Sequence, residues 1–270
     1  MSALPTRPLG DTGIEVSSIG LGTVKFGRDK GLKYPKHFNL PMDGEIVALL
    51  EEAKTLGINF IDTAPAYGTS EEQIGRLLPN RPDWIIGTKV GEEFSAEGSH
   101  FDFSGDHTRK SIERSLRRLQ TDYLDLVLIH SNGDDLHILE NTDCLESLMR
   151  MKEKGLIRAV GMSTKTVAGG KRTLALSDVA MVTYNSNHTE ESPVIDLAQR
   201  TGKAIIVKKA MNSGHIARQS GGNKSALEFV LRKAGVSCII IGTINPYHLR
   251  SNAYVAASFQ AEHSTNPALW

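Results

Sequence analysis

The sequence predicts a single (β/α)8 TIM barrel over residues 1–270, with an N-terminal β-hairpin capping the barrel bottom. Short β-branched or apolar runs alternate eight times with amphipathic, capped segments. The runs are apolar almost throughout, which is typical of a parallel sheet covered by helices on its outer face. No third spaced glycine follows GLGT, and no stretch ends in the GKS or GKT of a phosphate-binding loop. These two observations disfavour an open dinucleotide-binding sheet.

The first expected element is the hairpin. Two short strand-like pieces in RPLGDTGIEVSS flank Asp11, Thr12 and Gly13. Asp and Gly favour tight turns, so this segment is expected to fold back on itself before the first barrel strand.

The barrel elements follow in order along the chain. Strands are expected at 17–22, 58–62, 84–89, 124–130, 157–163, 179–185, 204–209 and 237–243. Helices are expected at about 43–56, 70–78, 106–119, 142–154, 165–175, 192–201, 223–234 and 246–258. Ser70 and Gln73 have the spacing of a capping box. A glycine is placed to end a helix at Gly57, Gly155, Gly202 and Gly235.

Composition excludes several classes of protein. Hydrophobic residues make up 40% of the chain and charged residues 23%, which excludes a disordered or collagenous protein. Lys+Arg and Asp+Glu both total 31, a balance that does not favour nucleic acid as a partner. No stretch approaches the roughly 20 apolar residues of a membrane span, and no secretory signal opens the chain. We therefore expect a cytoplasmic protein that has no membrane partner.

Cysteines and histidines predict neither a disulfide scaffold nor a metal site. Cys144 and Cys238 match no metal or redox spacing, and free cysteines are often buried as small apolar side chains. No two histidines pair at metal-ligand spacing.

Ionisable residues stand where three consecutive strands are expected to end. Asp62, Lys89 and His130 end the second, third and fourth strands, and Tyr67 follows on the loop after Asp62. Neighbouring strands lie about 4.8 Å apart, which brings these groups within roughly 10 Å at the end where barrel chemistry collects. Taken singly, each has a plain structural explanation: a turn residue, a solvated lysine, a hydrogen-bonded histidine or a packed ring. Their joint placement favours a site.

Five segments resemble the aldo-keto reductase superfamily, in particular its bacterial branch with short C-terminal tails. They are GLGT, INFIDTAPAYG, TKVG, LVLIH and GMST, and the resemblance runs from about residue 7 to about residue 258. It implies an NAD(P)H-dependent oxidoreductase that interconverts a small aldehyde, ketone or sugar and its alcohol. It also implies a catalytic tetrad of Asp62, Tyr67, Lys89 and His130.

Each member of the tetrad has an expected role. Tyr67 gives the proton to the carbonyl oxygen during reduction and acts as base in oxidation, which requires its pKa to fall from near 10 toward neutrality. Lys89 favours the phenolate, and Asp62 holds the lysine in place. His130 donates a hydrogen bond that orients the carbonyl and stabilises negative charge on its oxygen.

The resemblance also implies positions that bind the cofactor. They are Thr23, Asp62, Ser163, Thr164, Lys208, Lys209, Met211, Gly242, Thr243, His248 and Asn252. Three positions depart from the family pattern, because Thr164 replaces an asparagine, Met181 a glutamine, and Lys208 the aromatic ring that stacks on nicotinamide. Tyr184 is a candidate to supply that ring instead.

The choice between the two nicotinamide cofactors depends on the segment after the eighth strand. NADP(H) is the family norm, and its 2′-phosphate usually meets a lysine or arginine there. Here His248 takes the arginine's place, Ile244 carries no charge, and Arg250 is out of register. NADP(H) is the expected cofactor and NAD(H) is the alternative. His248 is otherwise a surface helix residue.

The loop after the third strand is the expected substrate loop. Phe94, Phe101 and Phe103, with Phe26 and Tyr34 from the first loop, are candidates for an apolar wall, unless they serve packing alone. The tail after Phe259 is short and polar, so an open pocket is expected. We expect a monomer or a weak homo-oligomer.

Two other functions remain open. A class I aldolase on the same barrel would use Lys89 as a Schiff-base nucleophile, but it leaves Asp62 and Tyr67 without a role. A regulatory subunit would keep the fold and the cofactor but little catalysis, and the altered positions Thr164, Met181 and Lys208 leave room for it.

Overall fold

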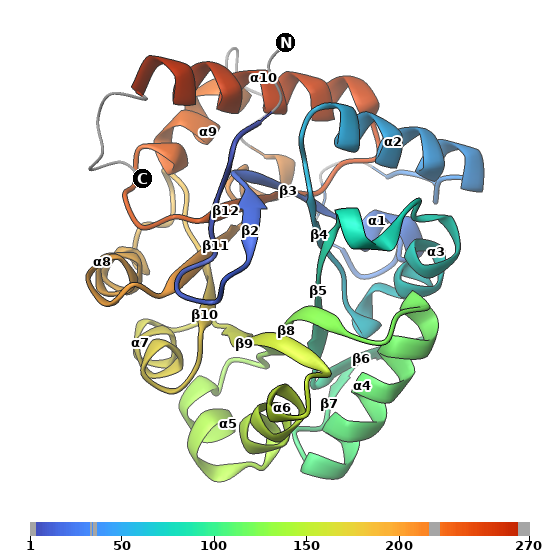
Figure 1. Cartoon of the computed structure of the whole chain (residues 1–270), viewed down its shortest axis with the longest axis vertical. Coiled ribbons are helices and arrows are strands. Elements are labelled where there is room, and N and C mark those ends of the chain that lie inside the picture. The colour runs from blue at the N-terminus through green and yellow to red at the C-terminus, as the bar shows by residue number, and fades with distance from the viewer. Residues whose placement is uncertain (1–3, 33, 35–36, 216–221, 264–270) are drawn as a thin grey trace.

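A closed barrel of parallel strands forms the centre of the protein (Figure 1). The computed structural model describes residues 4–32, 34, 37–215 and 222–263. Around the barrel the strand order is β10-β11-β12-β3-β4-β5-β8-β9. The strands are β3 (Ile19–Gly22), β4 (Phe60–Asp62), β5 (Ile85–Val90), β8 (Leu124–His130), β9 (Ile157–Ser163), β10 (Val179–Thr183), β11 (Ala204–Lys208) and β12 (Cys238–Ile241). The predicted (β/α)8 barrel is confirmed.

Helices cover the outside of the barrel and match the expected segments closely. They are α2 (Asp43–Thr55), α3 (Ser70–Leu77), α4 (Gly105–Leu119), α6 (Cys144–Glu153), α7 (Val167–Leu176), α8 (Ser192–Thr201), α9 (Gly222–Leu231) and α10 (Pro246–His263). The sequence did not predict two short helices, α1 (Val24–Gly27) and α5 (Asp135–Asn141), or three single turns, η1 (Pro65–Tyr67), η2 (Arg81–Asp83) and η3 (Asn212–Gly214). The glycines expected at helix ends all have positive φ, from 68° at Gly202 to 89° at Gly235.

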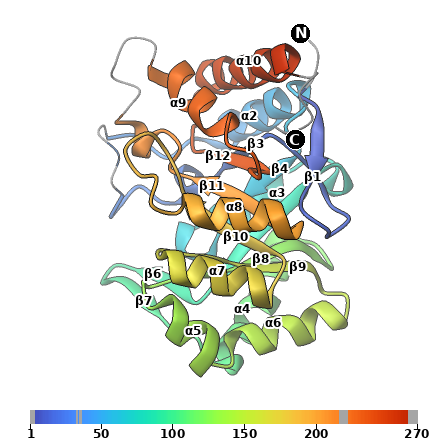
Figure 2. The same cartoon turned by 90° about the vertical axis from the view of Figure 1, so that its left-hand side faces the viewer.

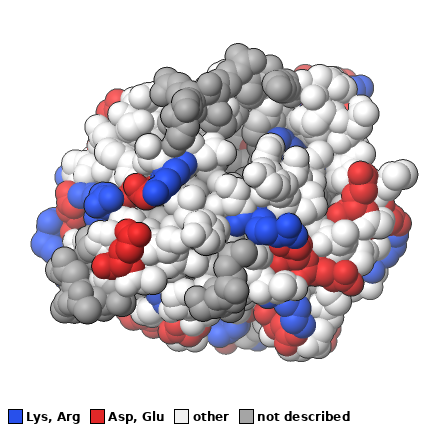
Figure 3. Space-filling view, turned by 90° about the horizontal axis from the view of Figure 1, so that it is seen from above, with Lys and Arg blue, Asp and Glu red and all other residues white. Residues whose placement is uncertain are grey.

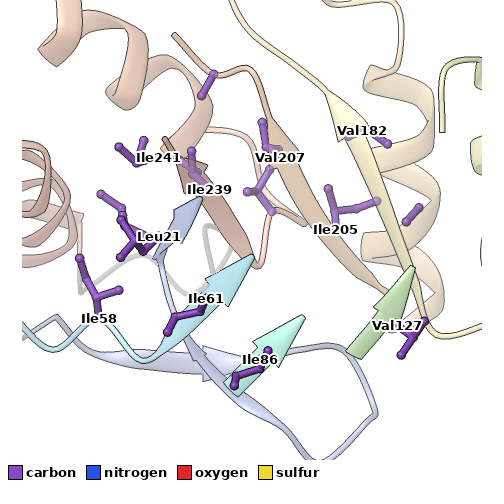
Figure 4. Close-up of a cluster of buried hydrophobic side chains, with 14 of the residues drawn as sticks. Leu21, Ile58, Ile61, Ile86, Val127, Val182, Ile205, Val207, Ile239 and Ile241 are labelled. Carbon is purple, nitrogen blue, oxygen red and sulfur yellow. The ribbon is translucent and has the colours of Figure 1, made fainter. Parts of the chain in front are cut away.

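The pleat of the strands divides the apolar core into an interior and an outer cluster. Successive strand residues point alternately into the barrel and toward the helices. On β8, Leu126 and Leu128 belong to the interior cluster, whereas Val127 and Ile129 belong to the outer one. Figure 4 shows part of the outer cluster, in which side chains from many strands line the space under the helices. The same alternation decides which strand-end side chains face the barrel axis.

Two β-hairpins lie at opposite ends of the barrel (Figure 2). The strands β1 (Thr6–Pro8) and β2 (Glu15–Ser17) pair antiparallel, and Leu9, Ile14 and Val16 pack on the interior cluster. The predicted N-terminal hairpin is therefore confirmed. The second hairpin, β6 (Glu92–Ser95) and β7 (Gly98–Phe101), replaces the plain loop expected after β5.

The expected capping box at Ser70 and Gln73 is wrong. Ser70 is the first residue of α3 after Thr69, and no side chain caps this helix. The Ser70 hydroxyl instead lies 2.8 Å from Thr23 Oγ1 and accepts a hydrogen bond from Thr63 Oγ1 at 3.0 Å. Burial makes an unpaired hydroxyl costly, so these tertiary contacts override the local cap.

The surface and the cysteines agree with the composition. On the face in Figure 3, acidic and basic side chains are interspersed. None of the helices in the described part of the chain is long and apolar enough to cross a membrane. The same residues contain no group of three or more His, Cys, Asp or Glu that could hold a metal ion. Cys144 and Cys238 are both buried free thiols.

Candidate active site

Three neighbouring strands bring Asp62, Lys89 and His130 to one end of the barrel. Asp62 ends β4, His130 ends β8, and β5 lies between them and carries Lys89. Phe60 and Leu128 belong to the interior cluster and stand two residues before Asp62 and His130. Since side chains alternate along a strand, Asp62 and His130 share the inward direction of those residues.

A buried ion pair lies beneath the ring of Tyr67. Lys89 is 1% exposed, and its Nζ donates to Asp62 Oδ1 at 2.5 Å and to the Thr63 carbonyl at 2.9 Å. The same nitrogen lies 4.7 Å from the centroid of the Tyr67 ring, which the turn η1 carries over the end of β4. The Tyr67 and His130 rings meet edge to face, with centroids 6.3 Å apart. The four side chains of the expected tetrad therefore lie together.

The phenol of Tyr67 keeps its proton through the neutral range. Burial raises the pKa of Tyr67 well above 10, and the charges of Asp62 and Glu92 raise it further, while Arg28 acts in the opposite direction. The positive charge of Lys89 is matched by Asp62 at 2.5 Å. This direction is opposite to the expected fall of the Tyr67 pKa toward neutrality, because burial and the nearby carboxylates outweigh Arg28. A protonated phenol is nevertheless the form that a proton donor requires.

Glu92, at the start of β6, is a site residue that sequence reasoning missed. Its Oε2 lies 2.7 Å from His130 Nδ1, and its Oε1 accepts a hydrogen bond from the Ser99 hydroxyl at 2.6 Å across the hairpin. Burial opposes ionisation of Glu92, but the hydrogen bond and charge of His130, with Ser99 and Arg28, hold its pKa at about 2. The second hairpin therefore places a permanent carboxylate behind His130. The sequence carries no clear signal for it, because the two strands of this hairpin have only four residues each.

The Glu92 carboxylate lies beside Nδ1 of the His130 ring, 2.7 Å away. Burial lowers the pKa of His130 below its ordinary 6.5, and Lys89 and Lys208 add to this, although Glu92 raises it. At neutral pH the ring is therefore neutral, and the form with its hydrogen on Nδ1 is the one that directs that hydrogen to the side of the carboxylate. Nε2 is then an acceptor, and protonation of the ring converts it into a donor.

Lys208 occupies the opposite side of the barrel mouth. It ends β11, and its Nζ donates to Ser163 Oγ and to the Thr164 carbonyl, both at 2.7 Å. Because β10 lies between β9 and β11, the lysine side chain spans the end of β10. Burial lowers the pKa of Lys208 to about 7, with Lys209 and Lys89 adding to the effect and Glu191 opposing it.

Two buried carboxylates that the sequence did not single out hold the loops around this side. Glu191 accepts hydrogen bonds from Thr164 Oγ1 at 3.2 Å and from the Thr183 amide at 2.8 Å. Asp135 accepts from the Thr166 amide at 2.8 Å and from its hydroxyl at 2.7 Å. The hydroxyl of Thr164, which stands at the family's asparagine position, therefore faces a carboxylate.

Thr23 connects two strands at the same end of the barrel. Its amide and its hydroxyl both donate to the Asp62 carbonyl, at 3.0 and 2.9 Å. These bonds join the ends of β3 and β4, so the hydroxyl hydrogen is used within the protein.

The corner between β12 and α10 offers features that fit a nucleotide. Asn252 is 2% exposed, and its Oδ1 is buried without a hydrogen-bond partner among the described residues. A buried acceptor of this kind is costly unless a donor such as an amino group meets it. At Gly242, an added Cβ would come within 3.0 Å of the Tyr34 hydroxyl. Thr243 is buried and accepts from the Asn245 amide at 3.1 Å.

The corner between β12 and α10 carries little positive charge. His248 is exposed and lies against the ring of Tyr247. Arg250 forms a two-pronged ion pair with Glu52 of α2, at 2.7 and 2.8 Å, and so points away from β12. Lys209 is exposed and has a φ of 57°, and Met211 packs against the outer cluster.

Tyr184 and Phe26 lie in the packed core and not at the expected places around the ligands. Tyr184 is 7% exposed and stacks on Phe229 at 5.2 Å, so it is packed in the outer core rather than presented to a ring. Phe26 is 1% exposed and is also a core residue, not part of a substrate wall.

The remaining aromatics of the expected wall lie on the loops. Phe94 lies under the Arg28 guanidinium at 3.4 Å, and Phe101 stacks on Phe103 at 6.0 Å. Tyr34 contacts Phe38 edge to face at 5.9 Å. Met181 is buried in the barrel interior, and its carbonyl accepts from the Thr164 amide at 3.0 Å.

Comparisons with known proteins identify the family of this chain. Residues 18–225 match the model of the aldo/keto reductase family. The chain is similar to a crystal structure of a proposed aldo-keto reductase from Pseudomonas aeruginosa, with 52% identity, a TM-score of 0.86, and coverage of 94% of this chain and 95% of that one.

Curated relatives carry the names of oxidoreductases. The chain is 36% identical to L-galactose dehydrogenase from Arabidopsis thaliana. The aligned part covers 60% of this chain and 49% of that enzyme. The chain is 32% identical to NADH-specific methylglyoxal reductase from Escherichia coli. The aligned part covers 77% of this chain and 67% of that enzyme. The match thus spans about half the length of the plant enzyme.

Proposed function

The chain belongs to the aldo/keto reductase family, and on that premise we propose that it interconverts a small aldehyde, ketone or sugar and its alcohol by hydride transfer. One observation carries the proposal. The Lys89–Asp62 ion pair lies 4.7 Å below the centroid of the Tyr67 ring, beside His130, at the barrel end where the strands finish. A half-buried phenol, a charged amine and an imidazole around one point are suited to protonating a carbonyl oxygen.

The nicotinamide cofactor supplies the hydride when it is bound. Ser163 would hold its carboxamide, and Asn252, whose Oδ1 lacks a donor, would accept a hydrogen bond from the adenine amino group. Gly242, Thr243 and Lys209 would surround its phosphates. We propose NADP(H), the cofactor expected from the resemblance, with NAD(H) as the alternative. The pairing of Arg250 with Glu52 favours that alternative, because it removes one cation from the corner.

Tyr67 supplies the proton in the reductive direction. Its raised pKa keeps the phenol protonated, and the Lys89 ammonium beneath the ring stabilises negative charge as the proton leaves. Asp62 holds that ammonium in place through the 2.5 Å hydrogen bond.

His130 aids the reaction in its protonated form. With Glu92 on Nδ1, only the imidazolium has a hydrogen on Nε2 to donate to the carbonyl oxygen. Glu92 is therefore proposed to position the ring and to stabilise its charged form.

The contacts of Lys89 disfavour the aldolase alternative. A Schiff base needs a neutral amine that a carbonyl can reach, whereas Lys89 is 1% exposed and bound to Asp62 and Thr63. Borohydride trapping with an aldehyde and no nucleotide should leave Lys89 unmodified.

The decisive assay follows oxidation of NADPH and NADH with a panel of small aldehydes, ketones and sugars. Tyr67→Phe should lower kcat by about a hundredfold or more and leave cofactor affinity unchanged, because only the proton donor is lost. Tyr247→Phe is the matched control. Tyr247 is 72% exposed, so this variant should behave like the wild type. An active Tyr67→Phe enzyme would refute the assignment. Cofactor binding without turnover of any carbonyl would favour a regulatory subunit.

A further inference from the structure

Lys208 is a half-buried lysine that the proposed reaction leaves without a role. Its Nζ donates to Ser163 Oγ and to the Thr164 carbonyl, both at 2.7 Å. Both of these acceptors are uncharged. A hydroxyl that accepts from the ammonium keeps its own hydrogen free, so Ser163 can still donate to a carboxamide oxygen. The lysine therefore adds a positive charge to the proposed nicotinamide pocket without consuming its donor.

The groups around Lys208 do not cancel this charge by direct pairing. Glu191 faces it from the segment before α8, but the carboxylate is bound to Thr164 Oγ1 and to the Thr183 amide. Asp135, at the start of α5, is bound to Thr166. The charge of Lys208 also interacts with two other cations, Lys89 of β5 and Lys209, and with the titratable ring of His130.

We propose that Lys208 makes the site discriminate between the two redox states of its nicotinamide cofactor, binding the reduced form and rejecting the oxidised form. The inference rests on the proposed function, since it places nicotinamide beside Ser163. Reduced nicotinamide is uncharged, whereas the oxidised ring is a pyridinium cation, and two cations placed close together repel each other.

This charge has a consequence for the direction of the reaction. A site that prefers reduced cofactor fills with it even when the oxidised form is abundant, and the oxidised product leaves readily. The chain is thereby suited to carbonyl reduction. Since burial holds the pKa of Lys208 at about 7, the preference should weaken as pH rises and the amine loses its proton.

The test measures dissociation constants for NADPH and NADP+, and then for NADH and NAD+, by calorimetry at about pH 6 and about pH 9. In the wild type, the ratio of the oxidised to the reduced constant should fall by about tenfold between these values. Both members of a pair carry the same phosphates, so titration at the phosphate site cancels in the ratio.

Three variants separate the causes. Lys208→Met should give a low ratio at both pH values, and Lys208→Arg a high ratio at both. Lys165→Met, at an exposed lysine on the loop after β9, should match the wild type. Lys208→Met also retains His130, so a pH-dependent ratio that survives in this variant would assign the effect to the imidazole and overturn the proposal.

The outcomes distinguish this inference from the function on which it rests. If folded wild-type protein binds neither redox form, the proposed function fails. If both forms bind, and the ratio is flat with pH and unchanged in Lys208→Met, the function stands and the role of Lys208 is refuted. Should Lys208→Met fail to fold, the wild-type pH dependence and Lys208→Arg decide the matter.

Discussion

The hydrogen on His130 is the most consequential single-residue feature of the site. Glu92 lies 2.7 Å from Nδ1, and burial lowers the pKa of the imidazole. Neutral His130 therefore presents a lone pair at Nε2, and the protonated ring presents a donor. Tyr67 keeps its proton throughout this range, because its pKa is well above 10. The pH dependence of carbonyl reduction should thus report on His130.

We predict that kcat/KM for reduction falls as pH rises through the pKa of His130, below 6.5. The sign follows because the active form is the protonated ring, which is lost as pH rises. Glu92→Gln removes a charge that raises the pKa of His130, so this pKa should drop and the falling limb should move to lower pH. NMR titration of the ring nitrogens, run beside the pH–rate profile, measures both effects.

Glu93→Gln is the control for this prediction. Glu93 is the neighbour of Glu92 on β6, but its carboxylate pairs with Arg114 and lies 3.4 Å from His107. The control should leave the His130 pKa and the pH–rate profile unchanged. A His130 titration that Glu92→Gln does not alter would show that the carboxylate does not position the ring.

At the residue scale, the sequence predicts strand-end groups better than loop groups. Asp62, Lys89 and His130 could be found because the strands that carry them are short apolar runs with clear ends. Glu92 and Glu191 could not, because their positions depend on a hairpin and a loop whose folding is set by tertiary contacts. The pKa of Tyr67 depends on burial, which a list of neighbours in the sequence does not give.

At the scale of elements, alternation along the strands determines which residues reach the site. Interior positions on β11 are Ala204 and Ile206, and the next residue in that series is Lys208. The eight strands and the principal helices could be predicted because their periodicity is strong. The short helix α5 and the hairpin β6–β7 could not, since each is brief and is held by contacts with distant segments, α5 by α7 and β6 by the turn η1. The sequence does not reveal the role of Ser70, because its buried hydroxyl bonds to Thr23 and Thr63 on the loops after β3 and β4 and not to its own helix.

The N-terminal hairpin should contribute to stability through its apolar contacts. We predict that Leu9→Ala lowers the free energy of unfolding by about 3 kcal/mol, because Leu9 is fully buried against the barrel interior. Urea unfolding measures the change. Leu136→Ala, at a side chain of α5 that is 41% exposed, should cost less than about 1 kcal/mol. Equal losses for the two variants would mean that the hairpin does not seal the barrel.

At the scale of the whole molecule, closure of the barrel joins two half-sites that are distant in sequence. β4, β5 and β8 carry the ion pair and His130, and β9 and β11 carry Ser163 and Lys208. Because β8 pairs with β9, His130 and Ser163 stand in register on adjacent strands. The sequence predicted the closed barrel. It could not predict that Lys208 would reach across β10 to Ser163, because that contact depends on the length and conformation of the lysine side chain.

Hydride transfer to a carbonyl carbon is the central claim, and isotope transfer tests it most directly. The enzyme is incubated with a reactive small aldehyde and with nicotinamide cofactor, NADPH or NADH, that carries deuterium at both hydrogens of C4. The alcohol product is then analysed by mass spectrometry. We predict one deuterium, bonded to the former carbonyl carbon, in the wild type, and no alcohol above background with Tyr67→Phe. An alcohol formed without deuterium would contradict the account.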